Sequence, residues 1–408
     1  MTKKSDAPAI RFKGFSDAWE QRKAIDIADY SKGNGYSKGD LTDAGTPIIL
    51  YGRLYTKYQF AISEVDTFAV PRNGAVYSQG NEVIVPASGE TAEDIARASA
   101  VEKSGVLLGG DLNILRPFDF INPLFLALAI SNGEPQKELA KKAQGKSVVH
   151  IHNTDIQEVT IVYPSRTEQD RIVSVFRQLD HLITLHQRKF EKLTNVKKSM
   201  LEKMFPQNGS SYPEIRFKGF TDPWEQREVG DLLIERSQQA PMSDEYPLMA
   251  FIANEGVAPK GERYDRSALV TDTVNKLYKK TEKGDFIYSS NNLETGSIGL
   301  NKYGKACISP VYSIFEPTGI ADSDFLGRRL VRKDFINAMV KWRQGVIYGQ
   351  WRIHESDFLK IEISVPSVEE QRKIGAYLDQ LDNLITLHQR ELKKLQNIKK
   401  SMLEKMFV

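Results

Sequence analysis

The sequence contains few residues in patterns that could support catalysis. Gly145-Lys146-Ser147 matches the end of a phosphate-binding loop, G-x-x-x-x-G-K-S, but the first glycine of that pattern would fall on Ala140. No glycine-rich fingerprint follows a strand-like run, as a dinucleotide or S-adenosylmethionine fold would require. The Asn-Pro-Pro and Asp-Pro-Pro motifs of amino-methyltransferases do not occur either. The sequence therefore predicts neither a nucleotide site nor a methyl-donor site.

Metal ligands and nucleophiles are equally sparse. The single cysteine, Cys307, cannot form an internal disulfide, which fits a reducing compartment. Four of the six histidines form two pairs that share a sequence context, His152 with His354 and His186 with His388. No H-E-x-x-H spacing occurs, and the acidic residues form no recognisable nuclease cluster. We therefore expect no metal site, and a binding protein rather than an enzyme.

Side chains suited to nucleic acid are plentiful in two stretches. Arginine and lysine suit guanine edges and phosphates, and asparagine and glutamine suit adenine. The first stretch offers the candidates Arg53, Tyr55, Lys57, Arg72, Asn73, Gln79, Ser88, Glu90, Lys146, Ser147 and His150. The second offers Arg263, Lys276, Lys279, Lys280, Asn291, Asn292, Lys302, Arg343, Tyr348, Gln350 and Arg352. Any one of them alone is more often solvated surface. The run VNKLYKK (274–280), with an aromatic residue among lysines, is the strongest local candidate for phosphate contact.

The composition is that of a globular protein with more than one domain. The chain has 408 residues, 40% hydrophobic and 27% charged, which predicts two or more domains. A net charge of +3 permits nucleic acid as a partner without arguing for it. The polar start contains no signal peptide, and no apolar run is long enough to span a bilayer. We expect a cytoplasmic protein without membrane contact.

A repeat divides the chain into two tandem parts. IRFKGFSDAWEQR (10–22) returns as IRFKGFTDPWEQR (215–227), and DHLITLHQR (180–188) returns as DNLITLHQR (382–390). NVKKSMLEKMF, ending at Phe205, returns as NIKKSMLEKMF, ending at Phe407. The residues between these motifs do not match. A constant frame with a variable insert, used twice, predicts a scaffold that carries two different binding regions.

The repeat predicts six segments. They are an N-terminal arm at 1–22, variable region 1 at 23–150, a central repeated region with a long helix at 151–206, a second arm at 207–227, variable region 2 at 228–352 and a C-terminal repeated region with a long helix at 353–408. The aromatic residues of each arm are expected to pin it against a larger domain. Each variable region mixes strand-like runs (81–86 and 284–289) with helical ones (122–131 and 334–342), which predicts α+β domains with short strands.

The repeated regions predict a strand followed by a long helix. Val159–Tyr163 and Ile361–Val365 alternate like strands and end at a proline, after which Ser165 and Ser367 can cap a helix. From Ile172 and Ile374 onward, apolar residues recur in steps of four and three, which is the period of a coiled coil. The predicted interface residues are Phe176, Leu179, Ile183, His186, Phe190, Leu193, Leu378, Leu381, Ile385, His388, Leu392 and Leu395.

The two helices are expected to pair with each other in antiparallel fashion. The link at 206–213 is too short to return the chain along the first helix, so the second helix must run back. The predicted architecture is a dumbbell with a pseudo-two-fold internal repeat, in which His186 and His388 lie close together near the middle. The positions of this four-three period are here called the seam. Two lysines at seam positions, Lys197 and Lys399, are expected to extend their ammonium groups to solvent.

These motifs resemble a known family. PSRTEQ (164–169) and PSVEEQ (366–371), each followed by LDxLITLHQR and KKSMLEKMF, are similar to the frame of the specificity subunit of type I restriction–modification systems. The resemblance covers residues 10–407 and is greatest to subunits from low-GC Gram-positive bacteria. The match is specific because both copies of the frame occur in the same order.

The resemblance implies a function in DNA recognition. Each variable region would be a target recognition domain that reads one half of a bipartite, asymmetric site in double-stranded DNA. The helices would set the spacer between the halves and dock two modification subunits, which bring S-adenosylmethionine and methylate adenine. Restriction subunits, expected to number two, would add ATP- and Mg-dependent translocation and cleavage. The family places no catalytic residue and no cofactor in this chain.

Two other functions remain open from the residues alone. The chain could be an adaptor whose ends bind proteins, which predicts no affinity for DNA with or without partners. It could also hold an unrecognised nuclease or transferase site in a variable region, which predicts activity from the purified chain alone.

Overall fold

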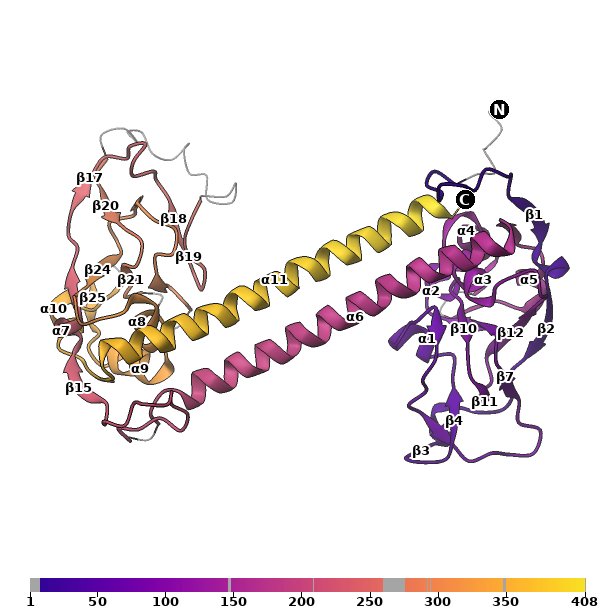
Figure 1. Cartoon of the computed structure of the whole chain (residues 1–408), viewed down its shortest axis with the longest axis horizontal. Helices are drawn as coiled ribbons and strands as arrows, with labels where there is room; N and C mark the ends of the chain where they lie inside the picture. Colours follow the sequence, from indigo (N-terminus) through magenta and orange to yellow (C-terminus); the bar gives the residue numbers. More distant parts are fainter. Residues whose placement is uncertain are drawn as a thin grey trace. The chain divides into compact units, whose positions relative to one another are not determined.

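Two long helices, α6 (Arg166–Lys203) and α11 (Val368–Met406), form the frame in the computed structural model of the chain (Figure 1). The structure describes residues 8–145, 148–207, 209–259, 276–291, 293, 295–347 and 350–407. It divides into unit 1, with Met1–Gln187 and Arg390–Val408, and unit 2, with Arg188–Gln389. Each unit therefore holds one variable region, the start of one long helix and the end of the other.

Variable region 1 contains short strands: β2 (Ala28–Lys32), β3 (Leu41–Thr42), β4 (Thr46–Ile49), β5 (Ala61–Ile62), β6 (Phe68–Ala69), β7 (Tyr77–Gln79), β8 (Glu82–Pro86), β9 (Ser88–Gly89), β10 (Ser99–Val101), β11 (Ser104–Leu108), β12 (Leu112–Pro117) and β13 (Val149–His150). They form two five-stranded sheets, of order β2-β12-β8-β10-β5 and β3-β6-β4-β11-β7, and the pair β13-β9. The central strand β8 is buried along its length, as its apolar sequence predicts.

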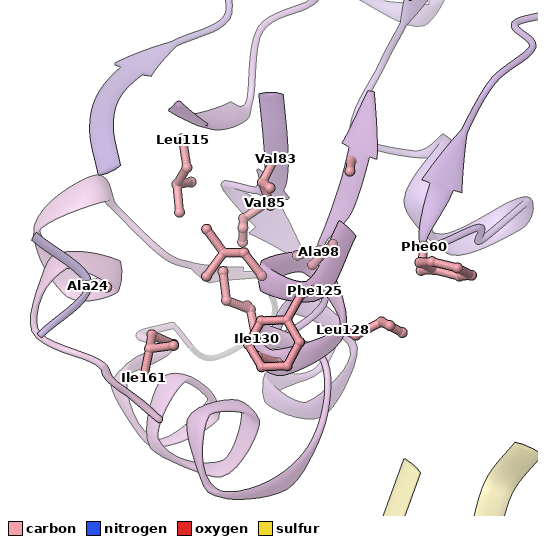
Figure 2. Close-up of a cluster of buried hydrophobic side chains, with 14 of the residues drawn as sticks. Ala24, Phe60, Val83, Val85, Ala98, Leu115, Phe125, Leu128, Ile130 and Ile161 are labelled. Atoms are coloured by element: carbon pink, nitrogen blue, oxygen red, sulfur yellow. The ribbon is translucent and has the colours of Figure 1, made fainter. Parts of the chain in front are cut away.

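Helices close the core of unit 1: α1 (Arg53–Thr56), α2 (Ala92–Ile95), α3 (Pro123–Ile130), α4 (Gly133–Lys142) and α5 (Asn153–Gln157). The helix α3 begins after Asn122, whose side chain accepts hydrogen bonds from two backbone N–H groups of the first turn. Because nearly all of its residues are apolar, α3 is buried on every side, and Phe125 lies in the same core as Val85 and Leu115 (Figure 2).

Among its described residues, variable region 2 contains the strands β16 (Leu233–Glu235), β17 (Gln239–Ala240), β18 (Ala250–Ile252), β19 (Gly256–Ala258), β20 (Tyr278–Thr281), β21 (Phe286–Tyr288), β22 (Ile298–Leu300), β23 (Ala306–Ile308), β24 (Ser313–Pro317), β25 (Gln344–Ile347) and β26 (Gln350–Arg352). The sheets have the orders β16-β24-β21-β22, β17-β20-β23, β18-β19 and β25-β26. The helices are α7 (Val229–Leu232), α8 (Ser323–Arg329), α9 (Lys333–Val340) and α10 (Glu355–Leu359).

Each arm adds a strand to the strand that precedes a long helix. In unit 1, β1 (Glu20–Lys23) is antiparallel to β14 (Thr160–Tyr163), and in unit 2, β15 (Glu225–Glu228) is antiparallel to β27 (Glu362–Val365). The tryptophan before each arm strand, Trp19 or Trp224, is buried in the core of its unit. The aromatic residues therefore pin the arms, as the sequence predicts.

Inside each unit the start of one long helix packs on the end of the other. In unit 1, Phe176 and Leu179 of α6 share a core with Met406 and Phe407, and Leu395 packs against that core. Because a helix start meets a helix end, this pairing is antiparallel. The next predicted seam residues of α6 in this unit, Ile183 and His186, are half-buried.

The same arrangement recurs in unit 2. Leu378 and Leu381 of α11 share a core with Met204 and Phe205, and Leu193 packs against it. The remaining predicted seam residues are all half-buried: Phe190, Ile385 and His388 in unit 2, and Leu392 in unit 1. The prediction of two α+β domains joined by an antiparallel helix pair is confirmed. The closeness of His186 and His388, which belong to different units, stays a prediction.

The seam lysines differ from the expectation. Lys399 Nζ lies 2.5 Å from Asp180 Oδ1, and Lys197 pairs in the same way with Asp382. Both lysine side chains are only partly exposed. The expected extension to solvent is wrong, because an aspartate of the facing helix stands within reach of each ammonium group. In each unit this ion pair links α6 to α11 at equivalent positions.

Candidate nucleic-acid interface

Three predicted candidates of variable region 1 meet at the β9–β13 pair. The Tyr55 hydroxyl donates to the carbonyl oxygen of Ser88 at 2.7 Å, and Ser88 Oγ lies 3.2 Å from His150 Nδ1. Ser88 is buried, whereas His150 and Glu90 are exposed. The fold thus assembles one edge from residues that are distant in sequence. Hydroxyl and imidazole groups can each donate or accept, so this edge can pair with either kind of base-edge group.

Arg97 belongs to this cluster and is missing from the predicted candidates. Its guanidinium lies 5.5 Å from the ring centroids of both Tyr55 and Tyr58, a cation–π arrangement. Burial raises the pKa of Tyr55, so its hydroxyl remains a donor. The contacts of Arg97 join segments about 40 residues apart, and no periodic pattern in the sequence signals them.

Arg53 and Lys57 point their charges at one aspartate. Arg53 Nη1 and Lys57 Nζ each lie 2.6 Å from an Asp66 carboxylate oxygen. The hydrogen bonds from Lys57 and from Arg53 lower the pKa of Asp66 to about 2. Arg53 is largely buried by these contacts, whereas about half of Lys57 stays exposed. Arg53 is thus held inside the domain, and Lys57 keeps a face toward solvent.

The other described candidates of unit 1, Arg72, Asn73 and Gln79, lie on exposed loops and edges. Arg72 pairs with Asp40 and stacks over the Tyr36 ring at 5.2 Å. Asn73 and Gln79 are exposed. These three candidates do not join the cluster of Tyr55, Ser88 and His150 through any contact that the structure gives.

In unit 2 the predicted lysine run lies beside aromatic rings. Lys280 Nζ lies 4.2 Å from the centroid of Tyr246, and Lys305 Nζ lies 5.5 Å from the same ring. Lys276 Nζ lies 5.8 Å from the Tyr278 ring. The intervening Lys279 is half-buried. This band of cations and rings, on β20 and its neighbours, has the composition that phosphate backbones and bases favour.

Other candidates of unit 2 have different surroundings. Lys302 Nζ lies 2.8 Å from Asp379 of α11, so it ties variable region 2 to the frame. Asn291 and Arg343 are half-buried. Gln350 and Arg352 lie in β26. The remaining candidates lie outside the described residues: Lys146, Ser147, Arg263, Asn292 and Tyr348.

The frame helices carry an apolar flank that the described residues leave exposed. Leu182 and Leu185 of α6 are 39% and 38% exposed, and Leu384 and Leu387 of α11 are 43% and 52% exposed. Each pair belongs to one copy of the LITL motif and sits one helical turn apart on one side of its helix. Because the same exposed leucine pair recurs in both copies of the motif, it is a candidate surface for contact with a partner protein.

The described residues were also searched for metal sites and for membrane-spanning helices. Among them, no group of three or more histidine, cysteine, aspartate or glutamate side chains could hold a metal ion. Within the same residues, the helices are too short or too polar to cross a membrane.

Comparisons with known proteins agree with these features. A family model described as "Type I restriction modification DNA specificity domain" matches residues 16–195 and 221–397. The chain is 25% identical over 312 residues to the putative type I restriction enzyme MjaX specificity subunit of Methanocaldococcus jannaschii, covering 73% of this chain and 70% of that protein. It is 22% identical over 362 residues to the type I restriction enzyme MjaVIII specificity subunit of the same organism, covering 81% and 79%.

A solved structure shares the fold. The S subunit of a type I restriction–modification system from M. genitalium superposes with a TM-score of 0.60 at 16% identity, covering 98% of this chain and 99% of that chain. The family model matches one copy of the frame and variable region at a time, and together its two matches cover most of the chain. The chain therefore belongs to the family of type I restriction–modification DNA specificity domains.

Proposed function

We propose that this chain is the DNA-reading subunit of a type I restriction–modification complex, in which each unit reads one half of a bipartite site. The observation that carries the proposal is the repetition of one frame around two different variable regions. Variable region 1 has two five-stranded sheets, whereas variable region 2 has sheets of four and three strands among its described residues. Two unlike readers on equivalent frames make the target asymmetric.

The reading surfaces follow from the two clusters described above. In unit 1 the exposed His150 and Glu90, beside the buried Ser88, offer donors and acceptors for base edges. In unit 2 the lysines of β20 and their aromatic neighbours supply phosphate contacts. The antiparallel helix pair between the readers acts as a ruler, since protein geometry sets the spacing of half-sites.

Two modification subunits dock on the frame in this proposal. The exposed pairs Leu182–Leu185 and Leu384–Leu387 come from the same motif, so they offer the same surface twice. Two identical surfaces suit two copies of one partner. Two restriction subunits then join the complex, as the family resemblance implies.

The chain itself is non-catalytic in this proposal and works in the cytoplasm. S-adenosylmethionine is bound by the modification subunit, and ATP and Mg by the restriction subunit. The modification subunit flips the target adenine out of the duplex, because a methyl donor cannot reach its amino group inside the stack.

The decisive test is genome-wide adenine methylation in cells that carry this chain with its modification subunit, against cells that lack the chain. The expected result is a bipartite motif, methylated on both strands, that disappears without the chain. Exchange of residues 23–150 for another variable region should change one half of the motif and leave the other intact. An assembled complex that produces no new methylation would contradict the proposal and favour a protein-binding adaptor.

A further inference from the structure

The start of each long helix carries a Glu-Gln pair that is almost fully buried. Glu168, Gln169, Glu370 and Gln371 are each 1% exposed or less. Acidic residues in a first helical turn usually face solvent and favour the helix dipole. Burial of an ionised carboxylate and a carboxamide costs free energy unless each finds partners. The hydrogen-bond partners of these four side chains therefore indicate which parts of the structure each side chain joins.

The two glutamates tie the arms to the helices. Arg11 donates two hydrogen bonds of 2.7 Å to the carboxylate of Glu168, and Arg216 donates two of 2.7 Å to that of Glu370. These bidentate pairs have matching geometry in the two units. The glutamates thus complete the frame and do not contact the variable regions in these bonds.

Gln169 joins the frame to variable region 1. Its Nε2 donates to the carbonyl oxygens of Pro164, at 2.9 Å, and Phe120, at 3.1 Å. Its Oε1 accepts from the backbone N–H of Asn122 at 2.7 Å. Pro164 lies in the turn before α6, whereas Phe120 and Asn122 form the loop that begins α3. One carboxamide therefore holds the recognition domain's helix against the first turn of the frame helix.

Gln371 makes the same contacts in unit 2. Its Nε2 donates to the carbonyl oxygens of Pro366, at 2.9 Å, and Ile320, at 3.3 Å. Its Oε1 accepts from the backbone N–H of Asp322, the residue that caps α8, at 3.0 Å. Two variable regions with different sequences and different sheets thus dock on the frame through the same two bonds, while the third bond orients the glutamine within the frame.

In each unit, two of the three bonds reach backbone atoms of the variable region, and the third, to Pro164 or Pro366, stays within the frame. Backbone carbonyl and N–H groups are present whatever the local sequence, so the glutamine can hold any recognition domain in the same orientation. A carboxamide is the side-chain group that supplies both the two donors and the acceptor used here. We propose that Gln169 and Gln371 are positioning residues that fix the angle of each recognition domain on its helix, and thereby the number of unread base pairs between the half-sites.

The size of the domains makes this angle matter. This inference rests on the proposed DNA-reading function. A domain of the length of variable region 1 has a radius of gyration of roughly 14 Å, so an edge roughly 20–25 Å from the docking loop lies well within its span. A tilt of about 10° would move that edge by roughly 4 Å, which is close to the rise of about 3.4 Å per base pair. A small loss of angular control would therefore admit targets with one base pair more or less.

The test compares spacer preference in the assembled methyltransferase, made from the full chain and its modification subunit. Duplexes carry the two half-sites found by methylation sequencing, separated by the wild-type spacer or by one base pair more or less. Competition binding gives the preference for the wild-type spacer. In Gln169→Leu or Gln371→Leu, this preference is expected to fall about fivefold, the scale of one net hydrogen bond, while the preferred half-site bases stay unchanged.

Matched controls lie on the same helices. Gln178 of α6 and Gln380 of α11 are exposed, so Gln178→Leu and Gln380→Leu should keep the wild-type spacer preference. Gln169→Asn serves if the leucine variants fail to fold. It keeps donors and acceptor but is one methylene shorter, so it cannot span the three backbone partners and should lower the preference in the same direction.

The outcomes separate the inference from the function on which it rests. A merely structural role would weaken binding to all three duplexes by the same factor, and that result would overturn the inference. So would a folded variant with the wild-type preference. Failure of the wild-type complex to bind or methylate any bipartite site would instead overturn the proposed function.

Discussion

The C-terminal phenylalanine should stabilise unit 1 although that unit begins at the other end of the chain. Phe407 is 6% exposed, and its ring centroid lies 5.7 Å from that of Phe125 and 6.0 Å from that of Phe176. Truncation of a buried phenylalanine to alanine costs about 3–5 kcal/mol. We expect Phe407→Ala to fall near the lower value, about 3 kcal/mol, because Phe407 is not fully buried.

Hydrogen exchange can localise this loss. The backbone N–H of Ile10 donates to the carbonyl oxygen of Lys405 at 3.1 Å, next to Phe407. If opening and reclosing are fast relative to the exchange chemistry, a loss of about 3 kcal/mol would accelerate exchange at the Ile10 amide by roughly 150-fold. The equivalent bond in unit 2, from the N–H of Ile215 to the carbonyl oxygen of Lys203 at 2.9 Å, should keep its protection.

Phe205 provides the matched variant. Its ring lies 5.5 Å from Phe325 and 6.0 Å from Trp224 in the core of unit 2. Phe205→Ala should accelerate exchange at Ile215 and spare Ile10. Leu387→Ala, at an exposed position, should change neither. The reasoning is refuted if Phe407→Ala leaves the protection of Ile10 unchanged, or if both amides accelerate equally in both phenylalanine variants.

Three further predictions concern the ion pairs and the exposed flank. Lys399→Ala should destabilise unit 1 by about 1 kcal/mol or less, because the Lys399–Asp180 ion pair is partly solvated. A double-mutant cycle with Asp180→Ala should show a coupling energy of similar size, and zero coupling would contradict the ion pair. Hydrogen bonds from a lysine and an arginine lower the pKa of Asp66 to about 2, so the stability that this carboxylate gives the folded state is present above the unfolded pKa of about 3.9 and is lost as the pH falls toward 2. An NMR titration of the Asp66 carboxyl with a midpoint near 4 would contradict this. In native mass spectrometry of the complex, Leu182→Asp should remove one bound modification subunit, and the double variant with Leu384→Asp should remove both. An unchanged number of bound subunits in the double variant would contradict the docking surface.

The frame was predictable from the sequence because its signals lie within short segments and occur in both repeats. The seam period of α6 and α11, the prolines that end β14 and β27, and the short link between the halves each specify structure over a few residues. The antiparallel direction of the helix pair could be inferred from the length of that link alone. The lysine contacts were mispredicted because the sequence does not show which acidic residue faces each seam position.

The candidate site was less predictable because its contacts are not local. Tyr55 meets Ser88 across 33 residues, and Ser88 meets His150 across 62. Residue type suggested these positions, but it suggested Arg53 equally, whose guanidinium is held by Asp66. Neither burial nor pairing of a loop arginine can be read from its neighbours in sequence. Assignment of a reading role to each candidate remains a prediction.

From the contacts of the frame we expect that variable regions can be exchanged, whereas helix ends cannot be removed. Unit 1 takes its arm from the start of the chain and the end of α11 from its other end, and Ile10 bonds to Lys405 there. In unit 2 the equivalent residues, Ile215 and Lys203, are joined by a short covalent link. Each unit is therefore completed by a helix end that belongs to the other repeat. A fragment that ends at Phe205 would leave the core around Phe176 without Met406 and Phe407. A new variable region must offer the buried glutamine a backbone loop and must also pack in this core, as Phe125 does.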